Sequence, residues 1–279
     1  MGIKLVIDTS ADLAPSDLDE SVAILPIPVY FEDREYIPYV NLEPAEFYGL
    51  QRSASKMPHT SQVPYVILKD TFQKALDNGD DVIAIFIASK MSGTYNTARL
   101  VKEELGSDRI FLVDSLTVTF PYSALALEAY KMVKSGQMTA KEIYERLLYL
   151  APRSKMLAVI DDLTYLKMGG RISGPIAVLA NFFNFKPIIA IDDGVIHDVG
   201  KERGLLKAML RMTEIINSAD VDRSLPCYIG HTDDLQKAER LTAILTEKTG
   251  LVPAKTIFIG PTVGTHAGPG STGVSYFIK

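Results

Sequence analysis

Residues 81–88, Asp-Val-Ile-Ala-Ile-Phe-Ile-Ala, form a continuous run of apolar and β-branched side chains, and this run decides the fold class. Such a run is typical of a strand that is buried on both faces of a parallel sheet. A helical pattern follows at Thr94–Leu105, closed by Gly106, and a second apolar run follows at Arg109–Val113. Strand, helix and strand in this order predict an α/β fold with a parallel sheet.

The same alternation extends on both sides of this unit as far as Pro152. Earlier strands are predicted at Lys4–Asp8 and Val22–Phe31, the latter interrupted by two prolines. Four further stretches carry helical spacing: Pro44–Ser53, Tyr65–Asn78, Pro121–Lys134 and Ala140–Leu150. Helices on both faces of a parallel sheet predict a three-layer N-terminal domain at residues 1–152.

The order of elements changes after Pro152. A strand is predicted at Met156–Ile160, an all-apolar helix at Ile172–Phe185, and a hairpin around the turn signal Asp192-Asp193-Gly194. The elements predicted beyond the hairpin are helices at Gly204–Ser218 and Leu235–Thr249, and strands at Leu225–Gly230, Ala254–Ile259 and Val274–Ile278. A hairpin together with helices predicts a mixed-sheet α/β domain at residues 153–279.

Composition and charge exclude several classes of protein. The 279 residues are 47% hydrophobic, which is typical of a folded globular chain, and the formal net charge of -5 gives no attraction to nucleic acid. The single cysteine, Cys227, excludes an intrachain disulfide and a cysteine-rich zinc site. The N-terminus lacks a leader pattern, and the longest apolar run, Val82–Ala88, is too short to span a membrane, so we expect a soluble, cytoplasmic protein.

Hydroxyl-bearing loops lie next to the predicted elements at the carboxyl edge of the sheet, where ligands of open α/β sheets bind. Thr60-Ser61 precedes one predicted helix, and Ser92-Gly93-Thr94 opens another. Free N–H groups and the positive end of the helix dipole suit an anion at such a position. The alternative is that these residues are ordinary helix N-caps.

A segment rich in glycine and proline, Gly260–Gly270, fixes a tight and irregular backbone path that presents His266. We interpret His266 as a positioned donor, and the alternative is a surface histidine. The segment His231–Asp234 contains residue types that bind metals, but no matched ligand set accompanies it, so no metal is expected. The Gly-x-Gly-x-x-Gly match at Gly268–Gly273 lies too close to Lys279 for a dinucleotide-binding unit.

In their order and spacing these segments resemble the DegV family, the bacterial fatty-acid-binding proteins that act as carrier subunits of fatty acid kinase. The resemblance covers the whole chain, through the segments Ile7–Leu13, Thr60–Pro64, Ser92–Tyr95, Asp114-Ser115, Gly169–Arg171, Lys186–Ile188, Lys201 with Arg203, and Gly264–Gly270. The chain departs from the family pattern at Thr9, which replaces a serine, and at Val63, which adds a residue before Pro64.

The resemblance implies two α/β domains that hold a long-chain fatty acid between them, with no other cofactor. The fatty acid carboxylate is expected to meet the hydroxyls and the imidazole of the motifs, helped by one backbone amide; these residues are Thr60, Ser61, Ser92, Gly93, Thr265 and His266. The acyl tail is expected to run along the apolar stretch after the Gly-Gly-Arg motif, at Ile172, Ile176, Leu179, Phe182 and Phe183.

The resemblance also implies partners. A separate kinase would phosphorylate the bound carboxylate, and an acyltransferase of phospholipid synthesis would receive the acyl phosphate, with transient contact at the membrane surface. Arg171, Lys201 and Arg203 are the residues expected to contact a partner. The chain itself is expected not to be an enzyme, because it carries no ATP-binding motif.

An enzyme of a different class is the alternative. A serine-dependent lipid hydrolase or acyltransferase would use Ser92 or Ser115 together with His266 and Asp114, and it would need the serine and the histidine within hydrogen-bond reach. Ser92 does not stand in the Gly-x-Ser-x-Gly setting of such nucleophiles.

Overall fold

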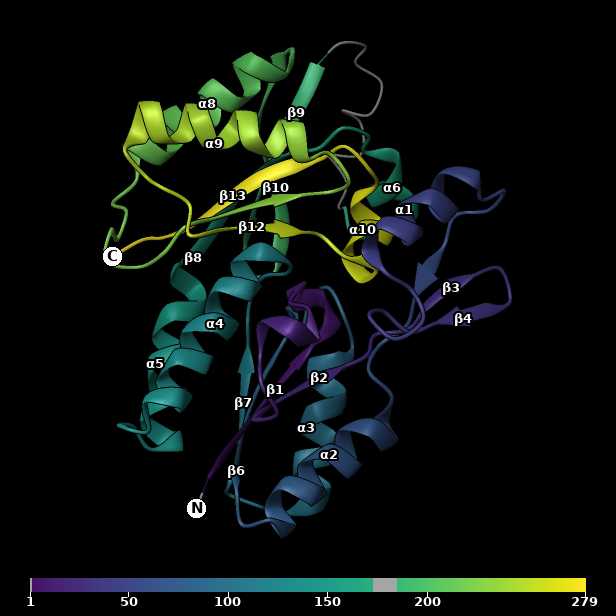
Figure 1. Cartoon of the computed structure of the whole chain (residues 1–279), viewed down its shortest axis with the longest axis vertical. Helices are drawn as coiled ribbons and strands as arrows, with labels where there is room; N and C mark the ends of the chain where they lie inside the picture. Colours follow the sequence, from purple (N-terminus) through teal and green to yellow (C-terminus); the bar gives the residue numbers. More distant parts are fainter. Residues whose placement is uncertain (1, 173–184) are drawn as a thin grey trace.

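Three β-sheets organise the chain in the computed structural model, which describes residues 2–172 and 185–279 (Figure 1). The first sheet has four parallel strands in the order β2-β1-β6-β7. Their bounds are β1 (Ile3–Asp8), β2 (Val22–Leu25), β6 (Asp81–Phe86) and β7 (Ile110–Asp114). Every residue of β6 after Asp81 is buried, as the continuous apolar run predicts, and the parallel sheet is confirmed.

Helices cover both faces of this sheet. α2 (Tyr65–Asp77) and α3 (Thr94–Leu105) pack together on one face, and α4 (Phe120–Ser135) and α5 (Ala140–Leu150) pack on the other (Figure 1). α3 ends at Gly106, which has a φ of +59° in the left-handed region, and α5 begins with a capping box formed by Thr139 and Glu142. Because these end signals are local, the sequence predicts both helices to the residue.

The second sheet is mixed and has six strands in the order β10-β9-β8-β13-β11-β12. Their bounds are β8 (Ser154–Val159), β9 (Phe185–Asp192), β10 (Val195–Arg203), β11 (Tyr228–His231), β12 (Lys255–Phe258) and β13 (Thr272–Phe277). β11 pairs with β12 in parallel, and the other neighbours are antiparallel. The mixed sheet and the hairpin of β9 and β10 are confirmed.

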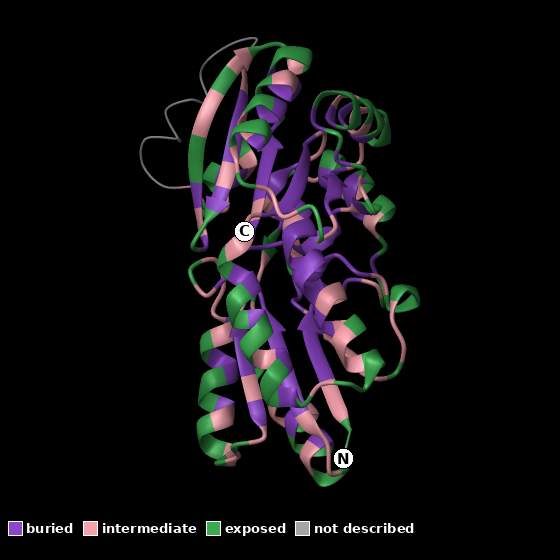
Figure 2. Cartoon of the chain, turned by 90° about the vertical axis from the view of Figure 1, so that its left-hand side faces the viewer, coloured by how far each residue is buried: buried purple, intermediate pink, exposed green. Residues whose placement is uncertain are grey.

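The two faces of the second sheet bury different residues, because side chains alternate along a strand. Leu157 and Ile188 pack with α8 (Leu205–Ser218) and α9 (Leu235–Thr249). Their neighbours Ala158 and Ile189 face the other way and join the core of the first sheet. One continuous core therefore connects the two sheets, and buried residues run along the long axis of the molecule in Figure 2.

The chain between β2 and α2 forms a small third sheet and one helix. The sheet has the order β4-β3-β5, with β3 (Val29–Phe31), β4 (Arg34–Tyr36) and β5 (His59–Thr60), and α1 (Pro44–Ser53) connects β4 to β5. The prediction of one strand over Val22–Phe31 is therefore wrong. Pro26 and Pro28 lack the N–H that a strand ladder needs, and the chain leaves the first sheet between β2 and β3.

The glycine-rich segment after β12 requires a second correction. It forms a short helix, α10 (Pro261–Ala267), and not an irregular loop. Pro261 stands in the first helical turn, where the N–H that proline lacks would have no intrahelical partner. Another short helix, α6 (Thr164–Met168), is not predicted from the sequence.

The predicted apolar helix at Ile172–Phe185 is only partly described. Its predicted end is wrong, because Phe185 is the first residue of β9. Ile172 is half-buried and packs against the main core. The other four residues predicted to line the tail lie outside the described residues: Ile176, Leu179, Phe182 and Phe183.

We propose residues 1–152 and 153–279 as two domains. The sheets support this division, because all strands of the first and third sheets precede residue 152 and all six strands of the second sheet follow it. The shared core means that the two parts are packed tightly against each other.

Candidate functional site

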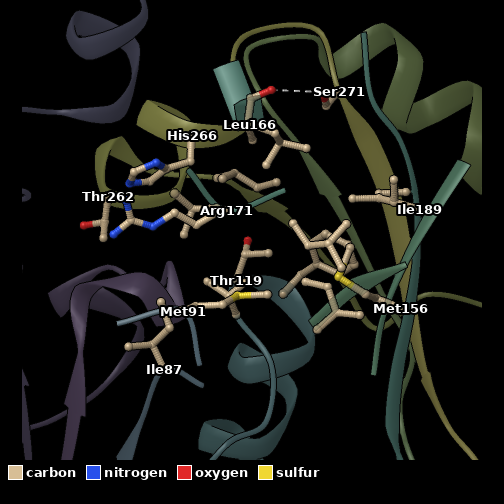
Figure 3. A pocket seen from close by; sticks show the side chains of 18 of the residues that line it. Ile87, Met91, Thr119, Met156, Leu166, Arg171, Ile189, Thr262, His266 and Ser271 are labelled. Atoms are coloured by element: carbon tan, nitrogen blue, oxygen red, sulfur yellow. Dashed lines mark hydrogen bonds between the residues drawn. The ribbon is translucent and has the colours of Figure 1, made fainter. Parts of the chain in front are cut away.

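A cavity lies between the first and second sheets (Figure 3). One wall comes from residues that follow β2, β6 and β7, such as Ile27, Ile87 and Val118, and the opposite wall comes from β8, β9 and β10. The cavity holds about 830 Å3 of space that no atom fills, its mouth included. This is the carboxyl edge of the parallel sheet, where ligands of open α/β sheets bind.

Polar side chains gather at one end of the cavity, which we call the polar end. Thr60, Arg171 and His266 lie there, with Thr262 beside them in Figure 3, and Ser61 and Ser92 line the same cavity. Thr60 Oγ1 on β5 and His266 Nε2 on α10 lie 2.9 Å apart and form a hydrogen bond. The structure thus brings four of the predicted head-group residues to one cavity, although they come from three separate segments of the sequence: Thr60, Ser61, Ser92 and His266.

The His266 ring is neutral at pH 7. Burial, reinforced by the positive charge of Arg171, lowers its pKa from 6.5 to about 4. Its Nδ1 atom has no hydrogen-bond partner among the described residues and lies against the backbone of Gly169, where a Cβ would be only 2.3 Å away. A neutral imidazole carries one N–H. When that hydrogen is on Nε2, it donates to Thr60, and the Thr60 hydroxyl is free to donate to a ligand.

Arg171 brings a positive charge to the same end. Figure 3 shows its guanidinium group next to the His266 ring, and its Nη1 donates to the Gly169 carbonyl oxygen at 2.5 Å. Within residues 2–172 and 185–279, no carboxylate forms an ion pair with it. From the Gly-Gly-Arg motif we expect Arg171 to face a cleft or a partner, and partner contact is the role predicted for it. The structure places Arg171 on the cavity wall, with the residue still exposed.

The loop that carries Ser92 is held by hydrogen bonds between hydroxyls and backbone. Ser92 Oγ lies 3.0 Å from Thr94 Oγ1 and accepts from the Thr94 N–H at 3.3 Å, and Thr94 Oγ1 accepts from the Val63 N–H at 3.2 Å. The alternative of an ordinary N-cap is wrong for Thr94, because Gly93 holds the N-cap position of α3 and no side chain caps the helix there. Ser92 accepts from the first amide of the helix and also lines the cavity.

Two other predicted head-group residues do not line the cavity in the described structure. Thr265 is fully buried, and its hydroxyl donates to the Pro261 carbonyl oxygen at 2.8 Å within α10. Gly93 precedes α3 and lies under the side chain of Gln62, so close that a Cβ on Gly93 would be 1.9 Å from Gln62 Oε1. Its backbone N–H belongs to the first amides of α3, which have no intrahelical partner.

α1 and the loop after β1 hold α10 in position. Tyr48 donates its hydroxyl hydrogen to the Ile259 carbonyl oxygen at 2.9 Å, and Gln51 Nε2 donates to the Gly264 carbonyl oxygen at 3.1 Å. A Cβ on Gly264 would be 2.5 Å from the Tyr48 hydroxyl, so this close approach requires glycine. At the start of α10, the Gly260 N–H donates to Asp12 Oδ1 at 2.9 Å. The glycines of the closing motif therefore serve close packing, which fixes where His266 lies.

Most of the remaining cavity wall is apolar, and its hydroxyl-bearing residues are Thr119, Thr262, Ser271 and Thr272. The apolar residues of the second sheet that line it are Met156, Ala158, Ile160, Ile189, Ile191 and Ile196. Figure 3 shows Met156 and Ile189 on the side of the cavity opposite to His266 and Arg171. The sequence does not single out these residues as cavity-lining, because a strand buried on both faces gives no signal for which face borders a cavity.

The residues of the alternative serine enzyme are not assembled. His266 Nε2 pairs with Thr60 and not with a serine, and the Ser115 hydroxyl donates to the Thr117 carbonyl oxygen at 2.9 Å. The Asp114 carboxylate accepts from the backbone amides of Ser89 and Leu116. The geometry therefore supports a binding site more than a nucleophilic triad.

The other two predicted partner residues lie on β10. Lys201 and Arg203 are exposed and stand over the ring of Phe185 on β9, at 5.6 and 5.5 Å from its centroid. They are not among the described residues that line the cavity.

Comparison with known proteins gives the family. The sequence model described as "Uncharacterised protein, DegV family" matches residues 2–279. The chain belongs to the DegV family. A DegV domain-containing protein from Halalkalibacterium halodurans is 31% identical over 280 residues, which cover 99% of this chain and 99% of the relative.

Solved structures of the DegV family share the fold. The fatty acid binding DegV family protein of Streptococcus agalactiae superposes with a TM-score of 0.87 at 27% identity and covers 100% of this chain and 99% of its own. A crystal structure described as DegV, a fatty acid binding protein from Bacillus subtilis, gives a TM-score of 0.85 at 27% identity, with 100% of both chains covered. In the described part of this DegV chain, no helix is long and apolar enough to cross a membrane.

Proposed function

We propose that this protein binds a long-chain fatty acid in the cavity between its two large sheets, with the carboxylate at the polar end. One observation carries the proposal: the Thr60–His266 pair and the Arg171 cation meet at one end of a cavity whose remaining walls are mostly apolar. The fatty-acid-binding proteins among the solved DegV structures have the same fold.

The apolar walls supply the affinity for the tail. Each methylene group moved out of water contributes about 0.8 kcal/mol, so fourteen methylenes contribute roughly 11 kcal/mol before the cost of ordering the chain. An amphiphile with one charged end and one long apolar chain matches this division of the cavity.

The polar end removes the cost of burying the carboxylate. An unpaired carboxylate in an apolar site is strongly unfavourable or takes up a proton. Hydroxyls of Thr60, Ser61 and Ser92 are available as donors, and Arg171 supplies the opposite charge. The neutral His266 does not add a second cation, and it orients the Thr60 hydroxyl. The ligand is therefore expected to bind as the carboxylate.

Native mass spectrometry of the intact protein mixed with oleate or palmitate tests this proposal. One fatty acid is expected per chain, and Thr60→Val should weaken uptake because it removes a donor to the carboxylate. Thr242→Val is the matched control, since Thr242 donates to the Ala238 carbonyl oxygen within α9, away from the cavity. A protein that takes up neither acid would contradict the proposal.

We further propose that the bound carboxylate is presented to a separate ATP-dependent kinase. A carboxylate oxygen would attack the γ-phosphorus of ATP, the bond to the bridging oxygen would break, and ADP would leave, giving an acyl phosphate for an acyltransferase of phospholipid synthesis. Two features support this: the sequence has no ATP-binding motif, and the Arg171 side chain at the polar end is exposed. Delivery to phospholipid synthesis would involve transient contact with the membrane surface.

Lys201 and Arg203 are the proposed contacts for the kinase. Lys201→Glu and Arg203→Glu should lower the rate of ADP release by a fatty acid kinase subunit with oleate and ATP, while the Kd for oleate stays unchanged. Lys141→Glu on α5 is the control, because Lys141 is also exposed and belongs to the opposite end of the fold. Equal rates for all three variants and the unchanged chain would contradict this contact.

A further inference from the structure

The apolar side chains of the second sheet form rows along the cavity. Met156 and Ala158 on β8 and Ile160 directly after it share one face, because side chains alternate along a strand. Ile160 lines the cavity and directly precedes the segment that contains α6 and leads to Arg171 at the polar end. Met156 is four residues back along the strand, about 13 Å away at ~3.3 Å per residue. The cavity thus extends from the polar end down the length of β8.

The last row of the wall contains an isoleucine pair. Ile191 on β9 and Ile196 on β10 are direct partners in the hairpin, whereas Ile189 is paired with Ala158 one row nearer to the polar end. Both isoleucines line the cavity and are almost fully buried. β10 is also the edge strand farthest from β12, which leads into α10 and His266. Two criteria, depth along the strand and position across the sheet, place this pair far from His266.

The tip of the hairpin is fastened to the first sheet. The Gly194 N–H donates to the Leu116 carbonyl oxygen at 2.8 Å, and Lys90 Nζ lies 2.6 Å from Asp193 Oδ2. Gly194 approaches Ala88 so closely that a Cβ on it would be 3.0 Å from the Ala88 Cβ. These contacts hold the end of the hairpin against the loops after β6 and β7. The part of the hairpin that carries Ile191 and Ile196 therefore cannot move outward without breaking these contacts.

From these positions we propose that Ile191 and Ile196 are the stop that limits the length of the bound acyl chain. β-Branched side chains have few rotamers and fill space rigidly, unlike Met156 beside them. Ala158, in the middle row, has the smallest side chain among the residues of this wall. This inference rests on the proposed fatty acid binding and names the residues that set its chain-length preference.

Competition among palmitate, stearate and arachidate for the intact protein, read by native mass spectrometry, tests the stop. Ile196→Ala and Ile191→Ala should each shift the bound population toward the longer acids. If two more methylenes are buried, the ratio of bound arachidate to stearate should rise by about fifteenfold, at ~0.8 kcal/mol for each methylene. Ile196→Phe should shift the population toward palmitate.

Ile188→Ala is the matched control. Ile188 is fully buried in β9, the strand that also carries Ile191, but its side chain faces α8 and α9. Its truncation should therefore lower stability without changing the preferred chain length. Ile196→Val and Ile188→Val repeat the comparison with smaller cavities if the alanine variants do not fold. Unchanged preference in the Ile191 and Ile196 variants, or an equal shift in the Ile188 variants, would overturn the stop while leaving fatty acid binding intact. If the unchanged chain binds none of the three acids, the proposed function itself is wrong.

Discussion

Arg171 is the residue that should contribute most to the affinity for an anion, because no described carboxylate is paired with it. Hydrogen bonds to charged groups contribute about 1.5–3 kcal/mol, so Arg171→Gln should weaken oleate binding by roughly ten- to a hundredfold. The remaining affinity should depend less on salt, since salt screens the lost charge. Isothermal titration calorimetry at low and high ionic strength measures both effects.

Arg99→Gln provides the control for charge. Arg99 lies on α3, pairs with Glu103 at 3.6 Å, and does not line the cavity. Its loss should leave the oleate Kd unchanged. If both arginine variants bind oleate as the unchanged chain does, the polar end does not hold the carboxylate.

His266 should make stability depend on pH. Its pKa is lowered to about 4 in the folded chain from 6.5, so in this window the unfolded chain binds a proton that the folded chain does not. This contribution to stability is therefore present above pH 6.5 and is lost as the pH falls toward 4. His266→Gln should lose less stability than the unchanged chain across this window, as measured by urea unfolding. Parallel pH profiles for the two chains would show that the ring is not buried as a neutral group.

Asp12 should make the stability of the folded chain change with pH in the opposite direction to His266. Burial raises its pKa from 3.8 to about 7, and its Oδ2 atom has no hydrogen-bond partner among the described residues. Between these values the folded chain holds a proton that the unfolded chain has lost, so this contribution weakens folding as the pH rises. Asp12→Asn keeps an acceptor for the Gly260 N–H and removes the charge, so its advantage in stability should grow between pH 3.8 and about 7 and then level off. A constant difference at all pH values would contradict this assignment.

At the scale of elements, the contact between α1 and α10 should tolerate no added atom. Gly264→Ala would place a Cβ 2.5 Å from the Tyr48 hydroxyl and 2.8 Å from the Phe47 ring. Overpacking of this kind costs about 1–3 kcal/mol, and it should also weaken oleate binding because α10 carries His266. Thermal unfolding and the oleate Kd measure the two effects.

Gly49 on α1 offers a matched control within the same pair of helices. It is exposed, and a Cβ there would meet nothing within 4 Å. Gly49→Ala should therefore raise stability by roughly 0.5–1 kcal/mol, since alanine is the better helix former, and it should leave binding unchanged. If both alanine variants behave alike, close packing is not the reason for the glycine at position 264.

Elements with local end signals are predicted best from the sequence. The bounds of α1, α3 and α9 agree with their predicted ranges, because proline in a first turn or glycine at an end marks their limits. α10 is missed because its glycine at position 264 disfavours a helix in isolation, and contact with α1 overrides that preference. β5 is missed because a strand of two residues has no periodicity to detect.

At the scale of the whole molecule, the sequence predicts several polar residues of the cavity and does not single out the apolar residues of its described wall. Thr60, Ser92 and His266 lie in short motifs that mark polar loops, so each can be found singly. The apolar wall consists of residues on several strands of both sheets, whose side chains look like ordinary core until the sheets are placed together. Arg171 is recognisable from the Gly-Gly-Arg motif, but the orientation of its side chain depends on the turn before it and cannot be predicted from the sequence.

Because one core connects the two large sheets and the cavity lies between them, the chain should unfold as a single unit. Oleate at a hundred times its Kd should stabilise the folded chain by about 2.7 kcal/mol and raise the temperature of a single unfolding transition. Differential scanning calorimetry with and without oleate measures this. Two separate transitions, with only one of them shifted by oleate, would contradict binding between the sheets.

A crystal structure of the protein with oleate tests the central claim most directly, namely that a fatty acid lies between the sheets with its carboxylate at the polar end. We predict that the carboxylate lies within hydrogen-bond distance of Thr60 and of the Arg171 guanidinium, with the tail running past Ala158 toward Ile191 and Ile196. Oleate bound elsewhere, or with its carboxylate toward the isoleucine pair, would contradict the claim.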